Sequence, residues 1–323
     1  MNSSRAFRYG FDWDRNWILD FIMNTFPCLP IISSILVHPL VLYLLFRRNC
    51  AMKLDIRIGY ILTVMGLIFY DWALSFFIRL YILAPLPAIH CEGILCTMGL
   101  PKEMIMAIVA LAFAVHIPGF FWLIFRLHGI VASWRNWKLS TCAQVAGIIF
   151  HIFCTAVNVI GFTVFGRDSD NYAELLQREP EYDIFVQRGG TLFIFGSPGA
   201  PQYLKYELFI LVLSLGTNAV PLVVMMTHSI IILNGMGELT KSEKSIRQTR
   251  SLFRIVCLQM NSAFLCVILP FISIVSLASI DTRETFPEIV HATIRLAMIS
   301  LITINPLQFG LVFIWKNPSE WRR

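Results

Sequence analysis

Seven long apolar runs, separated by shorter polar segments, dominate the chain. They lie near residues 18–46, 58–86, 103–125, 140–165, 205–233, 254–279 and 290–315, and are called spans one to seven. Each approaches or exceeds the roughly 20 residues that a helix needs to cross about 30 Å of hydrocarbon. Helices are required because a segment in lipid must satisfy its own backbone hydrogen bonds, and the runs lack the alternation of barrel strands. The pattern predicts an all-α membrane protein, a seven-transmembrane helix bundle forming one domain over residues 1–323.

Composition agrees with this class and excludes an ordinary soluble protein. Of the 323 residues, 57% are hydrophobic and only 14% are charged, and the mean hydropathy is +0.68. These values lie outside the range of globular domains. The polar and aromatic segment 1–17 lacks the features of a removable signal peptide, so span one is expected to act as its own insertion signal.

The distribution of basic residues predicts the orientation. If the amino terminus is outside, the inner segments hold fifteen lysines and arginines against the four acids Asp55, Glu238, Glu243 and Glu320. The inner basic residues are Arg47, Arg48, Lys53, Arg57, Arg126, Arg135, Lys138, Lys241, Lys244, Arg247, Arg250, Arg254, Lys316, Arg322 and Arg323. The outer segments hold fewer basic residues, diluted by acids. The positive-inside rule therefore favours an outer amino terminus and an inner carboxyl terminus.

Two loops carry candidate functions. The longest, residues 166–204, mixes acidic, aromatic and turn-forming residues on the outer side, and it is either a solvated connector or a lid. The third inner loop places Lys241, Lys244, Arg247 and Arg250 at helix-like spacings of three. This cationic stripe suits either anionic membrane lipid or a protein partner, and both readings stay open.

Only one pair of cysteines lies in a loop on the oxidising side. Cys91 and Cys96 fall between spans two and three, whereas the other six cysteines lie in the spans or at the inner edge. If a disulfide forms, this pair is its expected site, provided that the Cβ atoms can meet. The long outer loop contains no cysteine, so a bridge from the top of span three to that loop cannot form.

Ionisable groups inside spans are candidate functional sites because charge in hydrocarbon is costly. Asp71 lies near mid-membrane, about 20 Å from the inner end of span two at the helical rise of 1.5 Å per residue. Arg79 and Arg295 lie closer to the outer end, where snorkelling is the plain alternative. Polar residues in other spans either join helices by hydrogen bonds or line a ligand pocket. This second set comprises His116, His151, Asn158, Asn218, Asn261 and Asn305.

No catalytic motif, cofactor motif or metal-ligand spacing competes with a membrane role. The chain has no phosphate-binding glycine loop, no Gly-x-Ser-x-Gly and no His-Glu-x-x-His. The sequence therefore predicts neither an enzyme nor a cofactor. Prolines at Pro118, Pro221, Pro270 and Pro306 interrupt spans three, five, six and seven, and they permit kinks that form cavities or hinges.

Short motifs around span two and at the carboxyl end carry a family resemblance. They are Asp71–Ser75 (DWALS), Ala84–Pro87 (APLP), Cys91–Gly93 (CEG), Gly99–Pro101 (GLP) and Lys316–Pro318 (KNP), with His291 at the start of span seven. Together with the seven spans, the long outer loop and the short tail, they resemble the nematode serpentine chemoreceptors, particularly the Srh and Sri families of the Str superfamily. The ending departs from that pattern, because Ser319 stands where a tyrosine is usual and Arg322 is displaced.

The resemblance implies a G-protein-coupled receptor on the ciliary plasma membrane of a sensory neuron. Its expected partners are a small environmental chemical, a heterotrimeric G protein and membrane lipid, and not nucleic acid. The alternatives are a ligand-gated ion channel and a small-molecule transporter. Rhodopsin-like signatures fit poorly, since span three ends Phe125-Arg126-Leu127 without an acidic residue before the arginine. Arg126 is carried over as a candidate contact for the G protein.

The charge asymmetry makes a direct prediction about topology. An epitope tag at the amino terminus should be stained on intact cells, because the positive-inside rule places that end outside. A tag at the carboxyl terminus, used as the matched control, should be stained only after permeabilisation. The reverse pattern would contradict the orientation.

Overall fold

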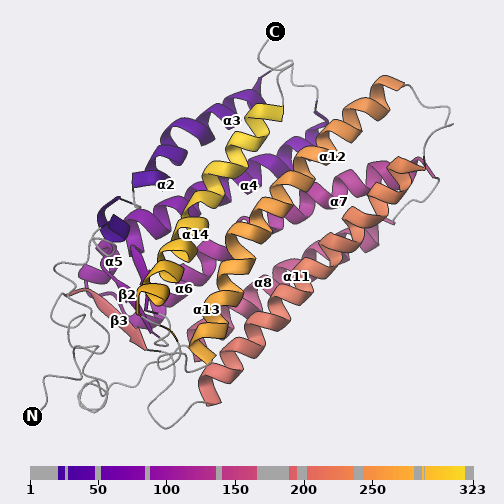
Figure 1. The fold of residues 1–323 in the computed structure, drawn as a ribbon. Helices are drawn as coiled ribbons and strands as arrows, with labels where there is room; N and C mark the ends of the chain where they lie inside the picture. The colour runs from indigo at the N-terminus through magenta and orange to yellow at the C-terminus, as the bar shows by residue number, and fades with distance from the viewer. Residues whose placement is uncertain are drawn as a thin grey trace, which may run out of the picture.

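The computed structural model shows a bundle of long helices with a small sheet at one end (Figure 1). It describes residues 21–25, 28–47, 52–83, 88–135, 140–165, 189–194, 202–235, 243–279, 286 and 288–316. We call the end that carries the sheet the sheet end and the other the opposite end. In Figure 1, α14 runs from the sheet end to the opposite end.

The helical segments follow the apolar runs, with π-helical segments labelled η. They are η2 (Phe21–Thr25), α2 (Cys28–Ile32), η3 (Ser33–Val37), α3 (His38–Phe46), α4 (Leu54–Trp72), η4 (Ala73–Ile78), α5 (Ile94–Thr97), α6 (Lys102–Ala114), α7 (Ile117–Ser133), α8 (Thr141–Phe165), α11 (Gln202–Asn234), α12 (Glu243–Ala263), η6 (Phe264–Ile268), α13 (Leu269–Ser279) and α14 (Glu288–Lys316). The strands are β1 (Leu80–Ile82), β2 (Ala88–Cys91) and β3 (Thr191–Ile194).

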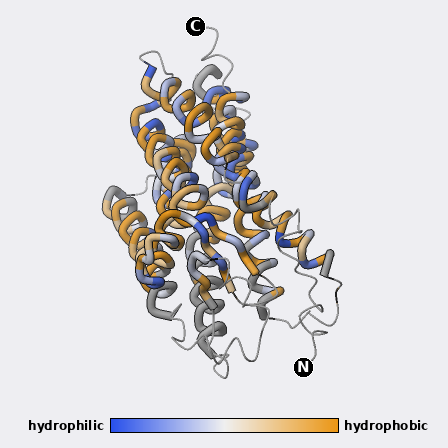
Figure 2. The backbone as a smooth tube through the Cα atoms, turned by 90° about the vertical axis from the view of Figure 1, so that its left-hand side faces the viewer, coloured by the Kyte–Doolittle hydropathy of each residue, from blue (hydrophilic) through white to orange (hydrophobic). Residues whose placement is uncertain are grey.

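These helices have the length and surface that a membrane requires. In the described part of the chain, five segments are long and apolar enough to cross a bilayer: Cys28–Phe46, Leu54–Ile78, Lys102–Ser133, Ile246–Ile268 and Val290–Lys316. Shorter apolar helices cover Val145–Gly161 and Ala219–Asn234. Hydrophobic residues follow the helices along most of their length (Figure 2). Large apolar side chains such as Leu36, Phe153 and Val224 are exposed on the outside of the bundle, as expected for a surface that faces lipid.

Three helix boundaries differ from the apolar runs. Span two was expected to remain helical to residue 86, but the helix ends at Ile78 and the chain enters β1, because strands can be as apolar as helices. Span three extends beyond 125 to Ser133, so that Arg126 lies within α7. Span six was expected to begin at 254, but its helix begins at Glu243, since a polar, basic turn can be as helical as an apolar one.

Prolines act differently in the four spans that contain them. Span three is divided into α6 and α7, and Pro118 stands in the first turn of α7, where its missing N–H is tolerated. Pro270 follows η6 at the start of α13. Pro221 and Pro306 lie inside α11 and α14, where each removes one backbone donor.

Glycines allow α4 and α7 to approach closely. A Cβ atom on Gly119 of α7 would lie 2.6 Å from the backbone nitrogen of Thr63, and one on Gly66 would lie 2.6 Å from the Cα atom of His116. Small residues at helix contacts let backbones approach in lipid, where packing replaces the hydrophobic effect. These glycines therefore fix the position of span two against span three.

The main core lies between α3, α4, α7, α11, α12 and α14. Tyr60 of α4 is fully buried, and its ring meets that of Phe313 edge to face at 5.0 Å between centroids. Phe309 contacts both Tyr60 and Phe120, at centroid distances of 6.4 and 5.9 Å. Aromatic contacts of this geometry add to the packing, so span seven is held to spans two and three.

A three-stranded antiparallel sheet covers part of the sheet end. Its strand order is β1-β2-β3, with Tyr81 opposite His90 and Cys91 opposite Thr191. Strand β3 comes from the long outer loop. Gly190, just before β3, has φ +84°, which favours glycine. The long loop is therefore tied to the segment between spans two and three.

The glycine contacts can be tested by adding a single methyl group. Gly119→Ala should lower the unfolding midpoint of the purified protein in detergent, because overpacking a helix contact costs about 1–3 kcal/mol. Gly129→Ala is the matched control on the same helix, where a Cβ would meet nothing within 4 Å. It should leave the midpoint unchanged or raise it slightly, since alanine is the better helix former. Equal midpoints for both variants would contradict the close contact.

Candidate functional site

A buried polar cluster surrounds Asp71 in the middle of the bundle. Its Oδ2 atom accepts a hydrogen bond from Ser33 and another from Ser34 at 3.0 Å, and it lies 3.2 Å from Nε2 of His38. Asp71 and Ser33 are each 1% exposed and His38 is not exposed at all. Groups from span one therefore surround one of the two carboxylate oxygens with polar contacts, which lowers the cost of burying Asp71.

The π-helical turn of span one explains how these groups reach one oxygen atom. Ser33 and Ser34 begin η3, and His38 follows it directly. A π-helical turn inserts an extra residue into the helix and changes which side chains share a face. Ser33 Oγ also lies 2.8 Å from the carbonyl oxygen of Pro30. Because a hydroxyl has one proton, Ser33 can donate to Pro30 or to Asp71 but not to both at once.

Span seven closes the cluster. A Cβ on Gly310 of α14 would lie 3.7 Å from Nδ1 of His38, so the imidazole packs against the helix backbone. Oδ1 of Asp71 has no hydrogen-bond partner among the described residues. The cluster thus lies at the junction of spans one, two and seven. One of the two carboxylate oxygens of Asp71 makes no hydrogen bond to a described residue there.

A second set of polar contacts surrounds Pro306 of span seven. Pro306 cannot donate to the carbonyl of Ile302 four residues earlier, and the hydroxyl of Tyr70 donates to that carbonyl at 3.0 Å. Tyr70 follows directly before Asp71 in span two. Further along α14, Gln259 of α12 donates to the carbonyl of Phe309 at 3.1 Å and accepts from Tyr60 at 3.2 Å. Spans two and six therefore both contact backbone oxygens of span seven.

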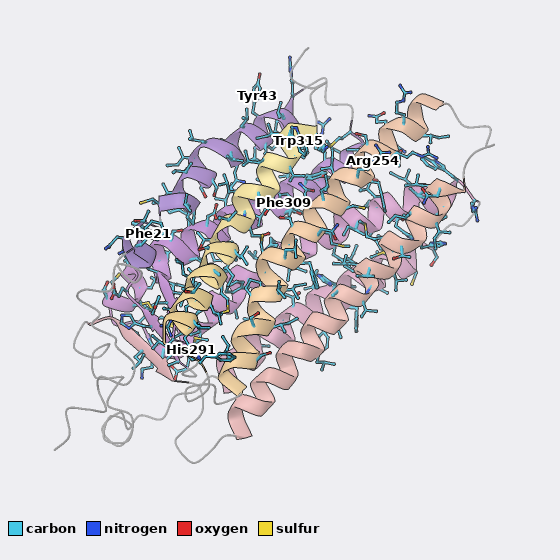
Figure 3. All side chains as sticks on the ribbon, in the orientation of Figure 1. Phe21, Tyr43, Arg254, His291, Phe309 and Trp315 are labelled. Atoms are coloured by element: carbon cyan, nitrogen blue, oxygen red, sulfur yellow. A yellow bond between two sulfur atoms is a disulfide. The ribbon has the colours of Figure 1, made fainter. Side chains whose placement is uncertain are left out.

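The sheet end holds a buried arginine. Arg295 of α14 is 1% exposed, so it does not snorkel to the surface. It hydrogen-bonds Tyr81 of β1; burial raises the pKa of that phenol, and the nearby positive charge acts in the opposite direction. Arg79 ends η4 in the left-handed region, with φ 48°. His291 lies one turn from Arg295 at the sheet end of α14, while Trp315 lies at the opposite end (Figure 3).

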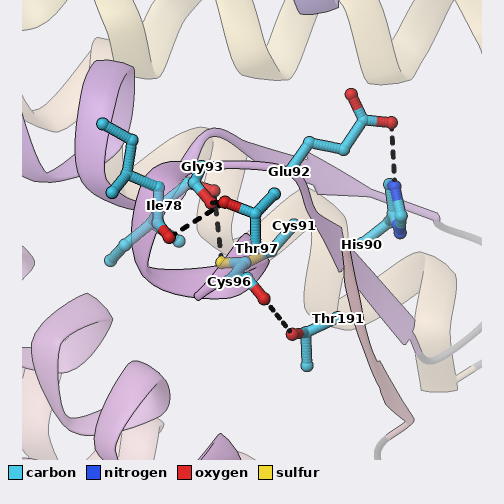
Figure 4. The surroundings of a disulfide bond; sticks show 9 residues. Ile78, His90, Cys91, Glu92, Gly93, Cys96, Thr97 and Thr191 are labelled. Atoms are coloured by element: carbon cyan, nitrogen blue, oxygen red, sulfur yellow. Dashed lines mark hydrogen bonds and ion pairs between the residues drawn. A yellow bond between two sulfur atoms is a disulfide. The ribbon is translucent and has the colours of Figure 1, made fainter. Parts of the chain in front are cut away.

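The predicted disulfide between Cys91 and Cys96 is present. The two Cα atoms are 6.0 Å apart, and the bridge closes the turn between β2 and α5 (Figure 4). Thr191 of β3 donates a hydrogen bond to the carbonyl of Cys96 at 3.2 Å. His90 lies 3.0 Å from Glu92, which adds a charged contact to the same corner. The disulfide therefore braces the sheet to which the long outer loop is tied.

The opposite end places Arg126 in an ion pair. Its guanidinium contacts the carboxylate of Asp55 in the first turn of α4 and lies over the ring of Trp122 at 5.5 Å. Trp122 donates to the backbone carbonyl of Asp55 at 3.0 Å. The pair is partly exposed, with 31% and 48% of the two side chains accessible. This end thus has a charged contact between spans two and three.

Two arginines meet the carboxyl end of α11. Arg250 of α12 donates to the carbonyl of Leu233 at 2.7 Å, and the guanidinium of Arg135 lies beside Gly235. Cations at a helix carboxyl terminus offset its unpaired carbonyls and its dipole. His128 and His228 join α7 to α11 nearby, with 2.9 Å between Nε2 and Nδ1.

The basic stripe of the third inner loop is therefore divided. Arg250 binds α11, whereas Arg247 is exposed on the same helix. Arg254, one further turn along, is also exposed (Figure 3). Lys241 and the side chain of Lys244 lie outside the described residues.

The remaining candidates are distributed over several faces. His116 lies at the junction of α6 and α7 against Tyr70, with 6.0 Å between ring centroids. Asn261 is exposed, and the side chains of Asn158 and Asn218 lie outside the described part. Neither His116 nor Asn261 is among the hydrogen-bond partners of Asp71, which are Ser33, Ser34 and His38. Sequence reasoning missed Ser33, Ser34 and His38, although three polar residues at the depth of Asp71 in span one were a signal for its partners.

These features define a helical membrane protein with a disulfide-braced cap at one end and a basic surface at the other. The family model of the serpentine type 7TM GPCR chemoreceptor Srh matches residues 18–304. The chain belongs to this family of seven-transmembrane chemoreceptors, as the sequence motifs indicated. No curated protein matches the chain in sequence.

The Asp71 cluster predicts a graded loss of stability. Asp71→Leu should lower the free energy of unfolding by about 3–5 kcal/mol, because His38 and two serines lose their acceptor in the interior. Asp71→Asn retains one oxygen acceptor and should lower it by about 1–2 kcal/mol. Both should retain the wild-type membrane topology.

Thermal unfolding of the purified protein in detergent measures the difference. Ser273→Ala is the control, because the Ser273 hydroxyl is exposed and bonds only within its own helix. Wild-type midpoints for both Asp71 variants would contradict the cluster.

Proposed function

We propose that this chain is a G-protein-coupled chemosensory receptor that detects a small environmental chemical. The observation that carries the proposal is the match of the Srh chemoreceptor family model to residues 18–304. The expected partners are a small-molecule ligand and a heterotrimeric G protein. The expected location is the plasma membrane, in the cilium of a sensory neuron, where contact with environmental chemicals serves an olfactory role.

The proposed orientation puts the sheet end outside the cell. Disulfides persist in oxidising compartments, and the Cys91–Cys96 bridge lies at this end. The exposed Arg247 and Arg254 lie at or beyond the inner end of span six, where the positive-inside rule expects basic residues. The disulfide and the basic residues support the same orientation.

Span seven is the proposed connection between the two ends. Its outer end contacts the sheet through Arg295 and Tyr81, and the hydroxyl of Tyr70 donates to its Ile302 carbonyl, four residues before Pro306. A ligand shifts a receptor only if it binds one arrangement better than the other. Movement of span seven about Pro306 would change the contacts of Tyr70 and Gln259, and so would alter the position of spans two and six.

The proposed surface for the G protein is the opposite end. Arg126 and Asp55 hold spans two and three together there, and Arg250 holds α12 to α11. Outward movement of span six requires the bond between Arg250 and Leu233 to break. The exposed Arg247 would then contact either the G protein or anionic lipid.

A ligand-gated channel and a small-molecule transporter are the alternative functions. A channel predicts a ligand-evoked current without any G protein, and a transporter predicts accumulation of labelled substrate in vesicles. Neither alternative is favoured by a particular contact in the described residues.

The proposal is tested by expressing the chain with a G-protein reporter and screening odorants for a dose-dependent response. Asp55→Asn should raise ligand-independent signalling, because it releases Arg126 at the opposite end. Glu103→Gln, in the first turn of α6 toward the sheet end, is the matched control and should leave basal signalling unchanged. A ligand-evoked current that persists without G proteins would refute the receptor assignment.

A further inference from the structure

One face of α8 carries polar residues in an otherwise apolar helix. His151 and Thr155 follow one another at a spacing of four, which places them on the same face. The faces that meet lipid carry exposed apolar residues, among them Ile149, Phe153 and Ile160. Helix α8 packs against α6, α7 and α11 (Figure 1). The polar face is therefore turned toward spans three and five.

One polar atom of each of these two residues is buried without a hydrogen-bond partner among the described residues. The ring of His151 stacks on Phe121 of α7, with 4.4 Å between centroids and 16° between planes, and the residue is 3% exposed. Within the described part of the chain, neither Nε2 of His151 nor Oγ1 of Thr155 has a hydrogen-bond partner, and both atoms are buried. Buried polar groups in native proteins are normally paired, and each exception requires an explanation.

We propose that His151 and Thr155 are the polar contacts of a ligand subsite between α8 and α7, and that its ligand is an uncharged small molecule with an apolar body and a hydroxyl or carbonyl oxygen. An imidazole nitrogen and a hydroxyl one turn apart can donate to and accept from a single such oxygen. Phe121 and Phe125, stacked at 6.2 Å, supply apolar surface beside it. That this molecule is the signal rests on the proposed function.

The scarcity of charged residues on α7 and α8 favours an uncharged ligand. Helix α8 contains no aspartate, glutamate, lysine or arginine. The charged residue of α7 is Arg126, which pairs with Asp55 and lies five residues beyond Phe121. An ionised ligand group at this depth would be desolvated without an opposite charge beside it, which is strongly unfavourable. Alcohols, ketones and esters meet the requirement, whereas carboxylates and amines do not.

The test uses matched probes on the full chain purified in detergent. The probes are alcohols and ketones of graded chain length and, for each length, the carboxylate, the ammonium ion and the alkane. The measurement is the unfolding midpoint with and without each probe. At least one alcohol or ketone should raise the midpoint of the wild type, and the ions and alkanes of the same length should not.

Two conservative variants test whether the rise in the unfolding midpoint depends on His151 and Thr155. His151→Phe retains the ring that stacks on Phe121 but removes the nitrogen, and Thr155→Val retains the shape but removes the hydroxyl. Each should abolish most of the rise produced by the best alcohol or ketone. Val157→Thr, the inverse exchange on the exposed face of α8, is the control and should retain it.

The ligand-free variants give a second, independent readout. Removing an unpaired buried polar atom is neutral or stabilising, so Thr155→Val should keep the ligand-free midpoint or raise it by roughly 2 °C. A fall in that midpoint would show that the hydroxyl already has a partner, and would overturn the subsite.

The remaining outcomes are equally decisive. No stabilisation by any alcohol or ketone, stabilisation by the carboxylate or ammonium series instead, or an unchanged effect in both variants would overturn the proposal. Stabilisation that depends on His151 and Thr155 without any G-protein response would keep the subsite and refute the receptor function. The two proposals therefore fail separately.

Discussion

The constraint on which the bundle depends is that a carboxylate in hydrocarbon must be satisfied by the protein itself. Asp71 meets it with three groups from one helix, Ser33, Ser34 and His38, all on a single oxygen. A regular helix does not bring residues spaced by one and by five onto one face, and the π-helical turn η3 alters the spacing at this point. The position of span one against span two follows from this pairing, and Gly310 of span seven leaves the space that Val37 and His38 need.

The same requirement explains the contact between Tyr70 and span seven. Pro306 leaves the carbonyl of Ile302 without its helical partner in a medium that offers no water, and Tyr70, the neighbour of Asp71, donates to it. Span two therefore supplies an acceptor to span one and a donor to span seven from consecutive residues. A rotation of span two that improved one contact would disturb the other. Tyr70 and Asp71 couple the three spans because they lie on one turn of one helix.

Hydropathy was sufficient for the helical architecture and the membrane class, because the length of an apolar run is a property of the local sequence. The Cys91–Cys96 bridge was also predictable, since no other cysteines lay on the side predicted to be oxidising. The end of span two was not predictable, because residues 80–82 are as apolar as the helix before them and form β1 only by pairing with β2. The polar residues of span one were a signal for the partners of Asp71, but the convergence of all three on one oxygen was not predictable, because it depends on a π-helical turn. The separation of Arg250 from Arg247 depends on where α11 ends, which charge spacing does not reveal.

Polar groups inside this bundle fall into two physical classes, and the distinction bears on function. Ser33, Ser34, Tyr70 and Gln259 each have a partner on another helix, so removing one exposes a second unsatisfied group, and such residues resist change. His151 and Thr155 have buried polar atoms with no partner among the described residues, so changing them removes an unfavourable group. A receptor that must recognise different chemicals can vary the second class without disturbing the first. The position of the ligand contacts on α8, away from the cluster of Asp71, allows recognition and transmission to change independently.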